Sequence, residues 1–511
     1  MGKEGQALMT RPPLPSFSIA LFFSPPQYAK IEVLFSVLLG GMEMKKGILA
    51  LLLLLLCYLL IGSIAPYTSQ PTPSAQTQDS FQASDCYGED TGSDRAAIID
   101  DNQTALELRL QMIAHAQEQL ILSTFDFRSD QAGTDLLAAL LDAGERGVQV
   151  RLLVDGFSAF LRMERNPLFY ALSSHPNIEI RVYNPIQLWK PWNLMGRLHD
   201  KYLIADHTAY LLGGRNCFNS FLGSYGGGQN RDRDVLVYNA ANDTDSSLYQ
   251  VEDYYRSVSA LDCCELFHDD EGLAERSSVQ EARETLHQRL AELKTRYPTC
   301  FAASCDYAAT TQPTRKITLL SNPTQVAVKE PVLFYQLMEL CKSAKKQVIL
   351  HTPYVIANDW MTEQLSQIGS KGQILLNSAA TNGNPFASSD YVRHKQELVD
   401  TGLEIHEYIG DISYHGKSIA IDDRLAIVGS FNMDMRSTYL DTELMLVIDS
   451  PEVTQELKTS MAALDAQAAV VADVDHYRSL PDGMAEPSLS TGKRVVQFLT
   501  GWALELGRFL L

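Results

Sequence analysis

The sequence has few positive charges for its length. Its 511 residues include 42 lysines and arginines against 62 aspartates and glutamates, which gives a formal net charge of −20 at pH 7. Proteins that bind along a phosphate backbone normally present a basic surface, because each contact neutralises a phosphate and releases counterions. The composition therefore counts against a nucleic-acid partner, although it leaves room for a small basic pocket.

The sequence also lacks a metal-binding pattern. Its eight cysteines are not spaced as zinc ligands are, so we expect no metal and no other cofactor. In an oxidising compartment, Cys300 could pair with Cys305, or Cys86 with one of the neighbours Cys263 and Cys264. Sequence alone leaves this connectivity open.

There is only one long apolar run, and it lies near the N-terminus. Residues 47–65 carry no charge and follow Lys45-Lys46, and their length is just enough to cross about 30 Å of hydrocarbon as a helix. We interpret the run as a single transmembrane anchor, with the lysines in the cytoplasm and the rest of the chain outside it. A cleaved signal peptide is the alternative, because Ser63-Ile-Ala65 resembles a cleavage site, but the proline that follows should hinder cleavage.

The segments on either side of this run show little pattern. Residues 1–41 are rich in proline and phenylalanine, and Met42 or Met44 would be a more conventional start. Residues 66–94 form a linker, of which 66–85 consist largely of Ser, Thr, Gln and Pro with nothing to bury. We expect that stretch to be a disordered tether.

The remainder of the chain contains an internal repeat. His199-Asp-Lys-Tyr-Leu-Ile-Ala-Asp206 returns as His415-Gly-Lys-Ser-Ile-Ala-Ile-Asp422. Each copy is followed at the same distance by a glycine turn that ends in asparagine, Gly213-Gly-Arg-Asn216 and Gly429-Ser-Phe-Asn432. A single His-x-Lys-x4-Asp motif is a weak signal, but two copies in matched surroundings indicate one composite active site.

The surroundings of the motifs repeat as well. Residues 118–124 correspond to 346–352, residues 177–180 to 402–405, and the run that opens at Asp234 to the run that opens at Glu443. Such short apolar runs are typical of buried strands, whereas residues 134–145 and 332–344 have helical spacing. Alternating strands and helices predict an α/β fold, with each half a sheet flanked by helices.

On these motifs the chain resembles the phospholipase D superfamily, whose members carry two such motifs in halves related by a pseudo-twofold axis. The second copy, with Gly429-Ser-Phe-Asn-Met-Asp-Met-Arg-Ser437 and Asp441-Thr-Glu443, resembles the bacterial cardiolipin synthase branch. That branch usually has asparagine in place of Asp441 and Gly-Ser in place of Gly213-Gly214. The resemblance implies two phospholipase D-like domains, each a mixed β-sheet flanked by helices, behind an N-terminal transmembrane helix.

The expected segments follow from this resemblance. They are an N-terminal extension (1–46), the anchor (47–65), the linker (66–94), domain 1 (95–262), a helical inter-domain segment (263–314), domain 2 (315–475) and a C-terminal amphipathic helix (476–511). The last prediction depends on an apolar stripe at helical spacing, formed by Val495, Phe498, Leu499, Trp502, Leu506, Phe509 and Leu510. Docking of this stripe on the protein's own core and insertion into a membrane interface both stay open.

The residue types of the motifs suit transfer at a phosphodiester. One neutral imidazole can attack phosphorus, while the other protonates the departing alcohol and then deprotonates the incoming one. By analogy with the superfamily, His199 is the nucleophile and His415 the general acid and base, although the sequence does not exclude the reverse. Lys201 and Lys417 would point to the same side of an extended strand as the histidines and flank the phosphate.

Other residues are assigned to the phosphate and to the histidines. Asn216, Asn432 and Ser430 are expected to donate hydrogen bonds to the phosphate. The resemblance implies that an acidic residue at the start of the strand after each glycine turn holds the second imidazole nitrogen. We assign this role to Asp234 in the first half and to Glu443 in the second.

The motif aspartates Asp206 and Asp422 complete the catalytic pattern. A structural role is nevertheless favoured for both, because a strand of this length would hold each aspartate far from its histidine.

The resemblance and the anchor together imply a phospholipid substrate at a membrane. The expected reaction joins two phosphatidylglycerols into cardiolipin and releases glycerol through a phosphohistidine. Hydrolysis of a phospholipid, or less favourably of nucleic acid, is the alternative, and an inactive membrane scaffold is disfavoured by the intact motifs. Trp189 and Trp192, shortly before His199, form either a lip at the membrane interface or a loop buried on its own domain.

Overall fold

The computed structural model describes residues 46–489, 491–492, 494–495, 497, 501, 505 and 507–511. The proposed N-terminal extension, with its alternative starts, lies almost entirely outside the described residues, as do Phe498, Leu499, Trp502 and Leu506 of the C-terminal stripe. The chain divides into two compact units, Met1–Ile61 and Gly62–Leu511.

An apolar helix covers the predicted anchor. It runs from Lys46 to Tyr67, 22 residues, and its length and composition are sufficient to cross a membrane. Its last turn, Ala65–Tyr67, is a 3-10 helix.

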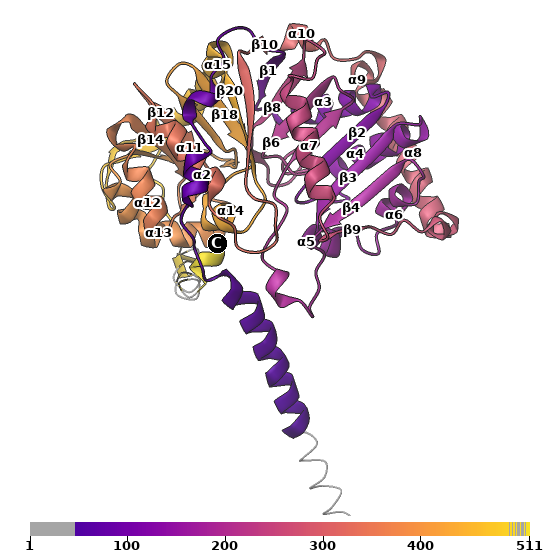
Figure 1. Cartoon of the computed structure of the whole chain (residues 1–511), viewed down its shortest axis with the longest axis horizontal. Helices are drawn as coiled ribbons and strands as arrows, with labels where there is room; N and C mark the ends of the chain where they lie inside the picture. Colours follow the sequence, from indigo (N-terminus) through magenta and orange to yellow (C-terminus); the bar gives the residue numbers. More distant parts are fainter. Residues whose placement is uncertain are drawn as a thin grey trace, which may run out of the picture. The chain divides into compact units, whose positions relative to one another are not determined.

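Two nine-stranded sheets form the second unit, one in each half of the chain (Figure 1). The first has the order β10-β1-β8-β6-β5-β2-β3-β4-β9, with β1 (Asp94–Ile99), β2 (Gln119–Thr124), β3 (Gln149–Asp155), β4 (Ile178–Tyr183), β5 (Tyr202–Ala205), β6 (Ala209–Gly213), β8 (Asp234–Asn239), β9 (Cys264–Leu266) and β10 (Gln312–Pro313). The second has the order β11-β20-β18-β17-β12-β14-β15-β21-β22, with β11 (Lys316–Ser321), β12 (Val348–His351), β14 (Gly372–Asn377), β15 (Glu404–Tyr408), β17 (Ser418–Ile421), β18 (Leu425–Gly429), β20 (Leu444–Asp449), β21 (Ala468–Val471) and β22 (Tyr477–Ser479).

Eight strands of each sheet follow the same order, and the edge strands β10 and β22 have no counterpart in the other sheet. In each, three neighbouring strands are parallel, β2-β3-β4 and β12-β14-β15, and the motif strands β5 and β17 run antiparallel to β2 and β12. Two short parallel pairs complete the strands, β7 (Asn230–Arg231) with β16 (Ser413–Tyr414) and β13 (Val355–Ile356) with β19 (Met433–Asp434). The predicted pair of mixed-sheet α/β halves is therefore confirmed.

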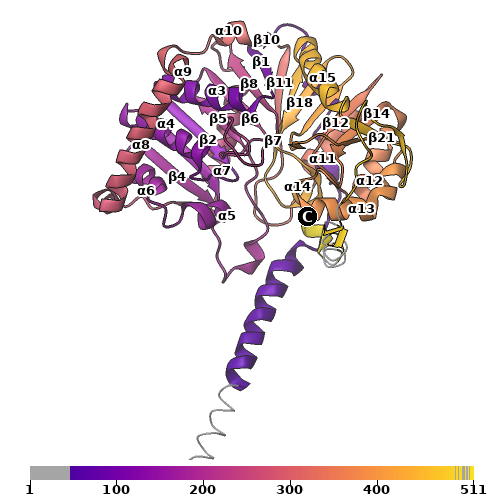
Figure 2. The same cartoon turned by 180° about the vertical axis from the view of Figure 1, so that it is seen from behind.

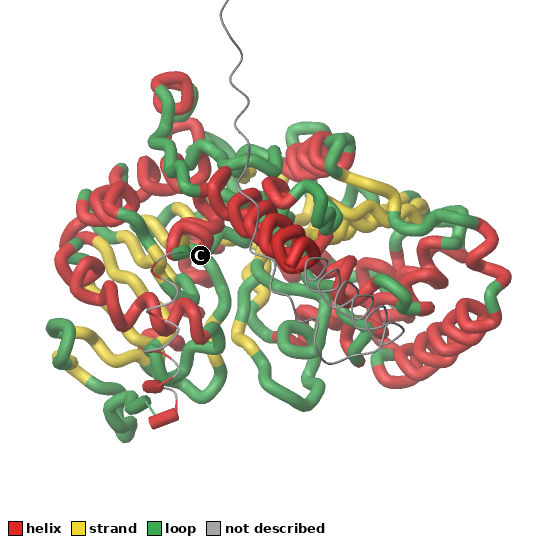
Figure 3. Tube along the Cα trace, turned by 90° about the horizontal axis from the view of Figure 1, so that it is seen from below, coloured by secondary structure: helices red, strands yellow, loops and turns green. Residues whose placement is uncertain are grey.

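Helices border the sheets in both halves (Figures 2 and 3). They are α2 (Ala75–Asp79), α3 (Asn102–His115), α4 (Gln131–Glu145), α5 (Gly156–Ser158), α6 (Pro167–Ser173), α7 (Ser247–Ser259), α8 (Ser277–Arg296), α9 (Pro298–Ala302), α10 (Tyr307–Thr310), α11 (Val332–Lys342), α12 (Asp359–Ser366), α13 (Pro385–Asp400), α14 (Met435–Tyr439) and α15 (Pro451–Asp465).

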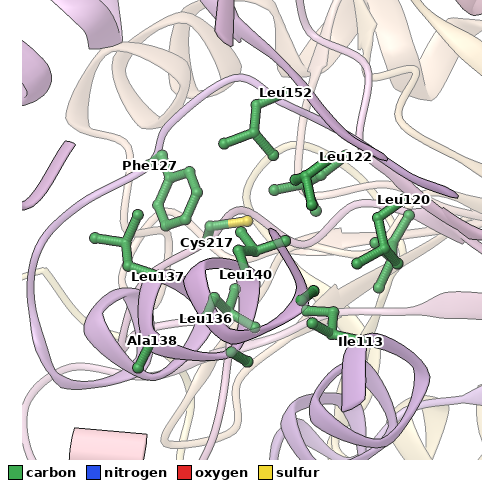
Figure 4. Packing of buried hydrophobic residues seen from close by; sticks show 14 of the residues in the cluster. Ile113, Leu120, Leu122, Phe127, Leu136, Leu137, Ala138, Leu140, Leu152 and Cys217 are labelled. Atoms are coloured by element: carbon green, nitrogen blue, oxygen red, sulfur yellow. The ribbon is translucent and has the colours of Figure 1, made fainter. Parts of the chain in front are cut away.

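Helix α4 illustrates how the local sequence sets these elements. It begins earlier than the predicted 134–145, because the Asp130 side chain caps it by accepting a hydrogen bond from the Gly133 amide. Its leucines at helical spacing are buried against the sheet (Figure 4). Helix α11 starts at the predicted residue 332 and ends two residues before the predicted end.

The halves are joined by exchanged helices and a common core. Helix α7 of the first half packs on β11 of the second, and α15 of the second packs on β1 of the first. One apolar cluster includes Ile98 and Val237 of the first sheet together with Val428 and Leu446 of the second. This shared core fixes the two motifs relative to each other.

The segment 263–314 belongs by its contacts to the first half. It supplies both edge strands of the first sheet, β9 and β10, and its long helix α8 packs on α4 and α6.

The expected disorder of residues 66–85 is wrong. Tyr67 and Thr77 are buried within this stretch, as is Cys86 directly after it, and Tyr67 and Cys86 belong to the core cluster of the second half. The Gly88 amide donates to Asp449 at 2.8 Å. The composition offered little to bury, but these three side chains fit a surface supplied by the second half.

The candidate disulfides do not form. All eight cysteines lie in the described part of the chain, and all are free. Cys86 and Cys264 belong to different core clusters.

Candidate active site

Each histidine lies where its own half meets a strand of the other half. The His199 amide donates to Thr442 Oγ1 at 3.1 Å, next to a parallel bridge between Leu198 and Thr442. Where β16 pairs with β7, the His415 amide donates to the Arg231 carbonyl at 2.6 Å. Both motifs therefore lie at the interface between the two halves.

The residue that follows each of these contacts is an acid that holds the histidine of the other half. Glu443 follows Thr442, and its Oε1 lies 2.8 Å from Nδ1 of His199. Asp232 follows Arg231, and its Oδ2 lies 2.6 Å from Nδ1 of His415. With Nδ1 engaged in this way, Nε2 is the nitrogen left for chemistry in both rings.

Burial controls the protonation of the His199 pair. Burial, and then the charges of Lys201 and Lys417, hold the pKa of His199 well below its usual range. Burial raises the pKa of Glu443 well above its usual range, against the opposing charge of Lys201. The Ser437 hydroxyl donates to Glu443 Oε1 at 2.6 Å, and the Ser430 hydroxyl donates to Oε2. His199 is thus a neutral imidazole in a fixed orientation.

The His415 pair differs in its charge. Burial and Lys417 lower the pKa of His415 to about 4, although Asp232 opposes the shift. Burial alone would raise the pKa of Asp232, but His415 and Lys417 hold it below its usual range. Asp232 therefore stays ionised beside His415 and is ready to stabilise an imidazolium.

The two motif lysines are buried next to their histidines. Lys201 Nζ donates to the His199 carbonyl, and Lys417 Nζ donates to the His415 carbonyl. Lys417 Nζ also lies 2.8 Å from Nδ1 and 3.2 Å from Nε2 of the His415 ring. Burial lowers the pKa of Lys201 to about 7 and that of Lys417 to about 8, in both cases against a nearby carboxylate. A bound phosphodiester would favour their charged forms.

Two phenylalanines flank the histidines. Phe125 meets the His199 ring edge-on at a centroid distance of 5.5 Å, and Phe221 meets the His415 ring at 4.9 Å. The His199 side chain is 13% exposed and that of His415 is 23% exposed, so both rings are largely shielded from solvent.

The predicted phosphate ligands are placed unequally. Asn216 and Asn432 are nearly buried; Asn216 Oδ1 accepts a hydrogen bond from the Asp126 amide at 3.2 Å. Asn432 Nδ2 lies 3.4 Å from Ser437 Oγ. Ser430 is the exception, because its fully buried hydroxyl is committed to Glu443. We therefore correct Ser430 from a phosphate ligand to a residue that supports Glu443.

The motif aspartates complete the catalytic pattern in the sequence but lie outside the catalytic cluster, in the structural role that was favoured for them. The Asp206 carboxylate accepts hydrogen bonds from the backbone amides of residues 117–119, and Asp422 does the same for residues 345–347. Both have positive φ, 51° and 52°, in the turn after the motif strand. Each carboxylate thus ties the end of the motif strand to the start of its neighbour.

Asp234 is not a histidine-orienting residue. Its buried carboxylate lies 2.8 Å from Arg109 and 3.3 Å from Arg215. Strand register gives the reason: Gly213 pairs with Asp234, whereas its counterpart Gly429 pairs with Met445. The counterpart of Glu443 is therefore Asp232, two positions earlier. Asp232 and Asp234 have the same parity in an extended chain, so the sequence offered no signal to choose between them.

A glycine makes room for the shorter acid. A Cβ at Gly214 would lie 2.2 Å from Asp232 Oδ1, so the first half has no side chain where the second half has Ser430. The departure from the Gly-Ser pattern is thus matched to aspartate in place of glutamate.

Asp441, which replaces the asparagine usual in the cardiolipin synthase branch, has polar partners for its carboxylate. It accepts a hydrogen bond from the Arg197 amide at 3.2 Å and lies 3.5 Å from Arg436 Nε. Burial raises the pKa of Asp441 to about 6, so this carboxyl is easily protonated. In its protonated form it is neutral, as the usual asparagine is.

The tryptophan loop before His199 is exposed. Trp189 is 67% exposed and Trp192 is also exposed, so the alternative of a loop buried on its own domain is wrong.

In the C-terminal stripe, Val495 is exposed, while Phe509 and Leu510 are partly buried and pack on the core of the second half. Throughout the described ranges, no group of three or more His, Cys, Asp or Glu side chains is arranged to hold a metal ion.

Comparisons with known proteins bear on both halves. The family model described as "Cardiolipin synthase, PLD-like domain" matches residues 110–252 and 337–464. Cardiolipin synthase C of Escherichia coli strain K12 is 26% identical over 390 residues, which cover 69% of this chain and 80% of that protein. Cardiolipin synthase 1 of Bacillus anthracis is 24% identical over 385 residues, with 73% and 67% covered.

A solved structure has the same fold. Phosphatidylserine synthase of Haemophilus influenzae Rd KW20 aligns with a TM-score of 0.58 and 16% identity, covering 81% of this chain and 95% of that chain. At this identity the likeness concerns the fold alone.

We predict that Asp422→Ala lowers the thermal stability of the full chain in detergent, because three backbone amides lose their acceptor. The expected cost is on the order of 2 kcal/mol. The matched control is Asp423→Ala, which removes an exposed carboxylate that pairs with Lys346 and Lys458. An equal loss of melting temperature in both variants would contradict the structural role of Asp422.

We also predict that His415 makes the fold sensitive to acid. Its folded pKa is about 4 and its unfolded pKa is about 6.5, so the unfolded chain binds a proton first and the free energy of unfolding falls as the pH drops through this window. His415→Gln should lose less stability than the parent chain between pH 6.5 and pH 4, by on the order of 2 kcal/mol. Melting temperatures that fall in parallel would refute the shift.

Proposed function

The chain belongs to the phospholipase D-like family whose description is "Cardiolipin synthase, PLD-like domain", and from this premise we propose that it is a membrane-anchored phosphatidyltransferase that makes cardiolipin. It would join two phosphatidylglycerols and release one glycerol. The observation that carries the proposal is the reciprocal arrangement of the site, in which each histidine is held by a carboxylate of the other half.

In the first step, Nε2 of His199 attacks the phosphorus of one phosphatidylglycerol. A P–N bond forms, the P–O bond to the headgroup glycerol breaks, and His415 gives its proton to the departing oxygen. Phosphatidyl-His199 and free glycerol result. Lys201 and Lys417 neutralise the charge that grows on the phosphate oxygens, with Asn216 and Asn432 as neutral donors.

In the second step, the terminal hydroxyl of another phosphatidylglycerol is the acceptor. His415 takes its proton, the oxygen attacks phosphorus, and the P–N bond to His199 breaks. Cardiolipin leaves, and both histidines regain their starting protonation. No step consumes a further reactant.

The unequal surroundings of the two histidines support these roles. Burial and two lysines favour the neutral form of His199, which a nucleophile requires. A proton donor has to be protonated, whereas burial and Lys417 lower the pKa of His415 to about 4. The ionised Asp232 opposes that shift, and the negative charge of a bound phosphodiester would raise the pKa of His415 as well.

Hydrolysis is the alternative function, with water in place of the second lipid. Phosphatidic acid would then be the product, since the same histidines serve either acceptor. The low exposure of both rings favours transfer, because a transferase has to keep water from the phosphohistidine. Action on nucleic acid is disfavoured by the net charge of −20.

The orientation in the membrane is part of the proposal. Lys45 and Lys46 precede the apolar helix, and basic residues beside a membrane span stay predominantly in the cytoplasm. The catalytic unit would then lie on the extracytoplasmic side of a cell membrane.

Lipid analysis tests the proposed reaction. The purified full chain, reconstituted with phosphatidylglycerol, should yield cardiolipin and glycerol in equal amounts, and His199→Ala and His415→Ala should each abolish both products. Mass spectrometry after reaction in water labelled with a heavy oxygen isotope separates the two alternatives, because only hydrolysis transfers a water oxygen to phosphatidic acid. Phosphatidic acid as the main product would overturn the synthase and support the hydrolase.

A pair of variants tests the corrected assignment of the first acid. Asp232→Asn removes the charge beside His415, and the turnover number should fall about 100-fold or more. Asp234→Asn disturbs Arg109 and Arg215 instead, so it should lower the melting temperature and leave the turnover number of the folded fraction near that of the parent chain. The reverse pattern would restore Asp234 as the orienting residue.

A further inference from the structure

The exposed apolar side chains of the first half are gathered in one region. Within the described residues 94–314, the exposed large apolar side chains are Phe157, Phe160, Leu161, Leu188, Trp189, Trp192 and Leu266. We call the first six the apolar rim. Trp189 and Phe160, exposed by 67% and 58%, are its most open members. A cluster of exposed apolar side chains normally marks a surface that contacts a membrane or another protein.

The two segments of the rim lie together. Phe157, Phe160 and Leu161 belong to α5 and the π-helical turn that continues it, Ala159–Met163. A Cβ at Gly156 would lie 2.2 Å from the Asn184 carbonyl oxygen, so this segment touches the base of the tryptophan loop. Helix α5 lies at the lower edge of the first half in Figures 1 and 2.

The rim is rigidly connected to the catalytic histidine. The buried Asp155 carboxylate accepts hydrogen bonds from the Phe157 amide at 2.7 Å and from the Leu198 amide at 2.9 Å. Leu198 directly precedes His199. Asn184 Nδ2 closes the tryptophan loop by donating to the Gly196 carbonyl at 2.8 Å. The rim therefore has a fixed position beside the active site.

The rim also lies where the membrane-spanning helix ends. The hydroxyl of Tyr67, the last residue of that helix, donates to the Trp192 carbonyl. A Cβ at Gly62 would lie 2.4 Å from Pro191 Cγ. A helix of 22 residues only just exceeds the thickness of the hydrocarbon core, so Tyr67 leaves the bilayer at its surface. Trp192, in contact with Tyr67, is held at the same depth.

The charges around the rim suit an anionic bilayer. Arg162, Arg165 and Lys190 are exposed among its apolar residues, with Glu164 as the one acid between the first two. Glu265 is a second acid beside the rim, because its carboxylate accepts a hydrogen bond from Gln187 of the tryptophan loop. Three basic side chains thus stand against two acidic ones here, whereas the whole chain has a net charge of −20. Basic residues beside interfacial aromatic side chains are attracted to anionic headgroups.

We propose that the apolar rim inserts into the interfacial layer of an anionic bilayer, beside the end of the chain's own transmembrane helix, and holds the His199 side of the active site against the lipid. Substrate lipid can then reach the histidines without passing through water. The inference deepens the proposed function by stating from which phase its substrate enters.

Depth-dependent fluorescence quenching tests the insertion without any turnover. The chain has four tryptophans, so a full chain with Trp360→Phe and Trp502→Phe reports only on Trp189 and Trp192. In nanodiscs that contain phosphatidylglycerol, lipids brominated close to the headgroup should quench its emission strongly, and lipids brominated at the chain end weakly. Emission that bromine does not affect at either depth would overturn the proposal, whether the rim then faces water or a protein partner.

A ratio of activities provides the second test. In Phe160→Ser/Trp189→Ser, turnover of bilayer phosphatidylglycerol relative to monomeric short-chain phosphatidylglycerol should fall about tenfold, because two apolar contacts with the bilayer are lost. The control is Leu480→Ser, an exposed leucine of the second half, which should leave the ratio unchanged. An unchanged ratio in the rim variant would overturn the proposal. Quenching together with phosphatidic acid as product would support the rim and refute the synthase.

Discussion

The reciprocal contact between carboxylate and imidazole is the interaction on which the rest of the structure depends. Glu443 and Asp232 are completely buried, and a buried carboxylate is costly unless its partner is held in place. Each partner belongs to the other half of the chain, so a small displacement of one half would break both contacts at once. The exchanged helices α7 and α15 and the common core are the means by which the chain prevents it.

The sequence predicted the architecture well because repetition and periodicity are local signals. The motif strands, the helices near 134–145 and 332–344 and the apolar helix after Lys46 were all found where expected. Register is not a local signal. The choice between Asp232 and Asp234 depends on which of them pairs with Gly213 across the sheet. In the folded chain Asp234 does, and only the hydrogen bonds between the strands determine this. The ordered linker was missed for a related reason, since the surface that buries Tyr67 and Cys86 belongs to a distant part of the chain.

The site also reconciles an acidic chain with an anionic substrate. In the proposed function, Lys201 and Lys417 are the charges that would face a phosphate, and burial lowers the pKa of each. Positive charge would then be concentrated where the phosphate binds and would be strengthened by its arrival. The exposed surface can remain acidic.

The two related halves belong to one polypeptide, and this affects how similar their sites have to be. Two identical copies of one half could form the same pair of contacts across a twofold axis, as an isologous dimer does, but both histidines would then have the same acid and the same neighbours. Joining the copies in one polypeptide removes that constraint. Here one position is Gly214 next to an aspartate and the other is Ser430 next to a glutamate, so covalent fusion gives the two histidines different surroundings, as the two roles proposed for them would require.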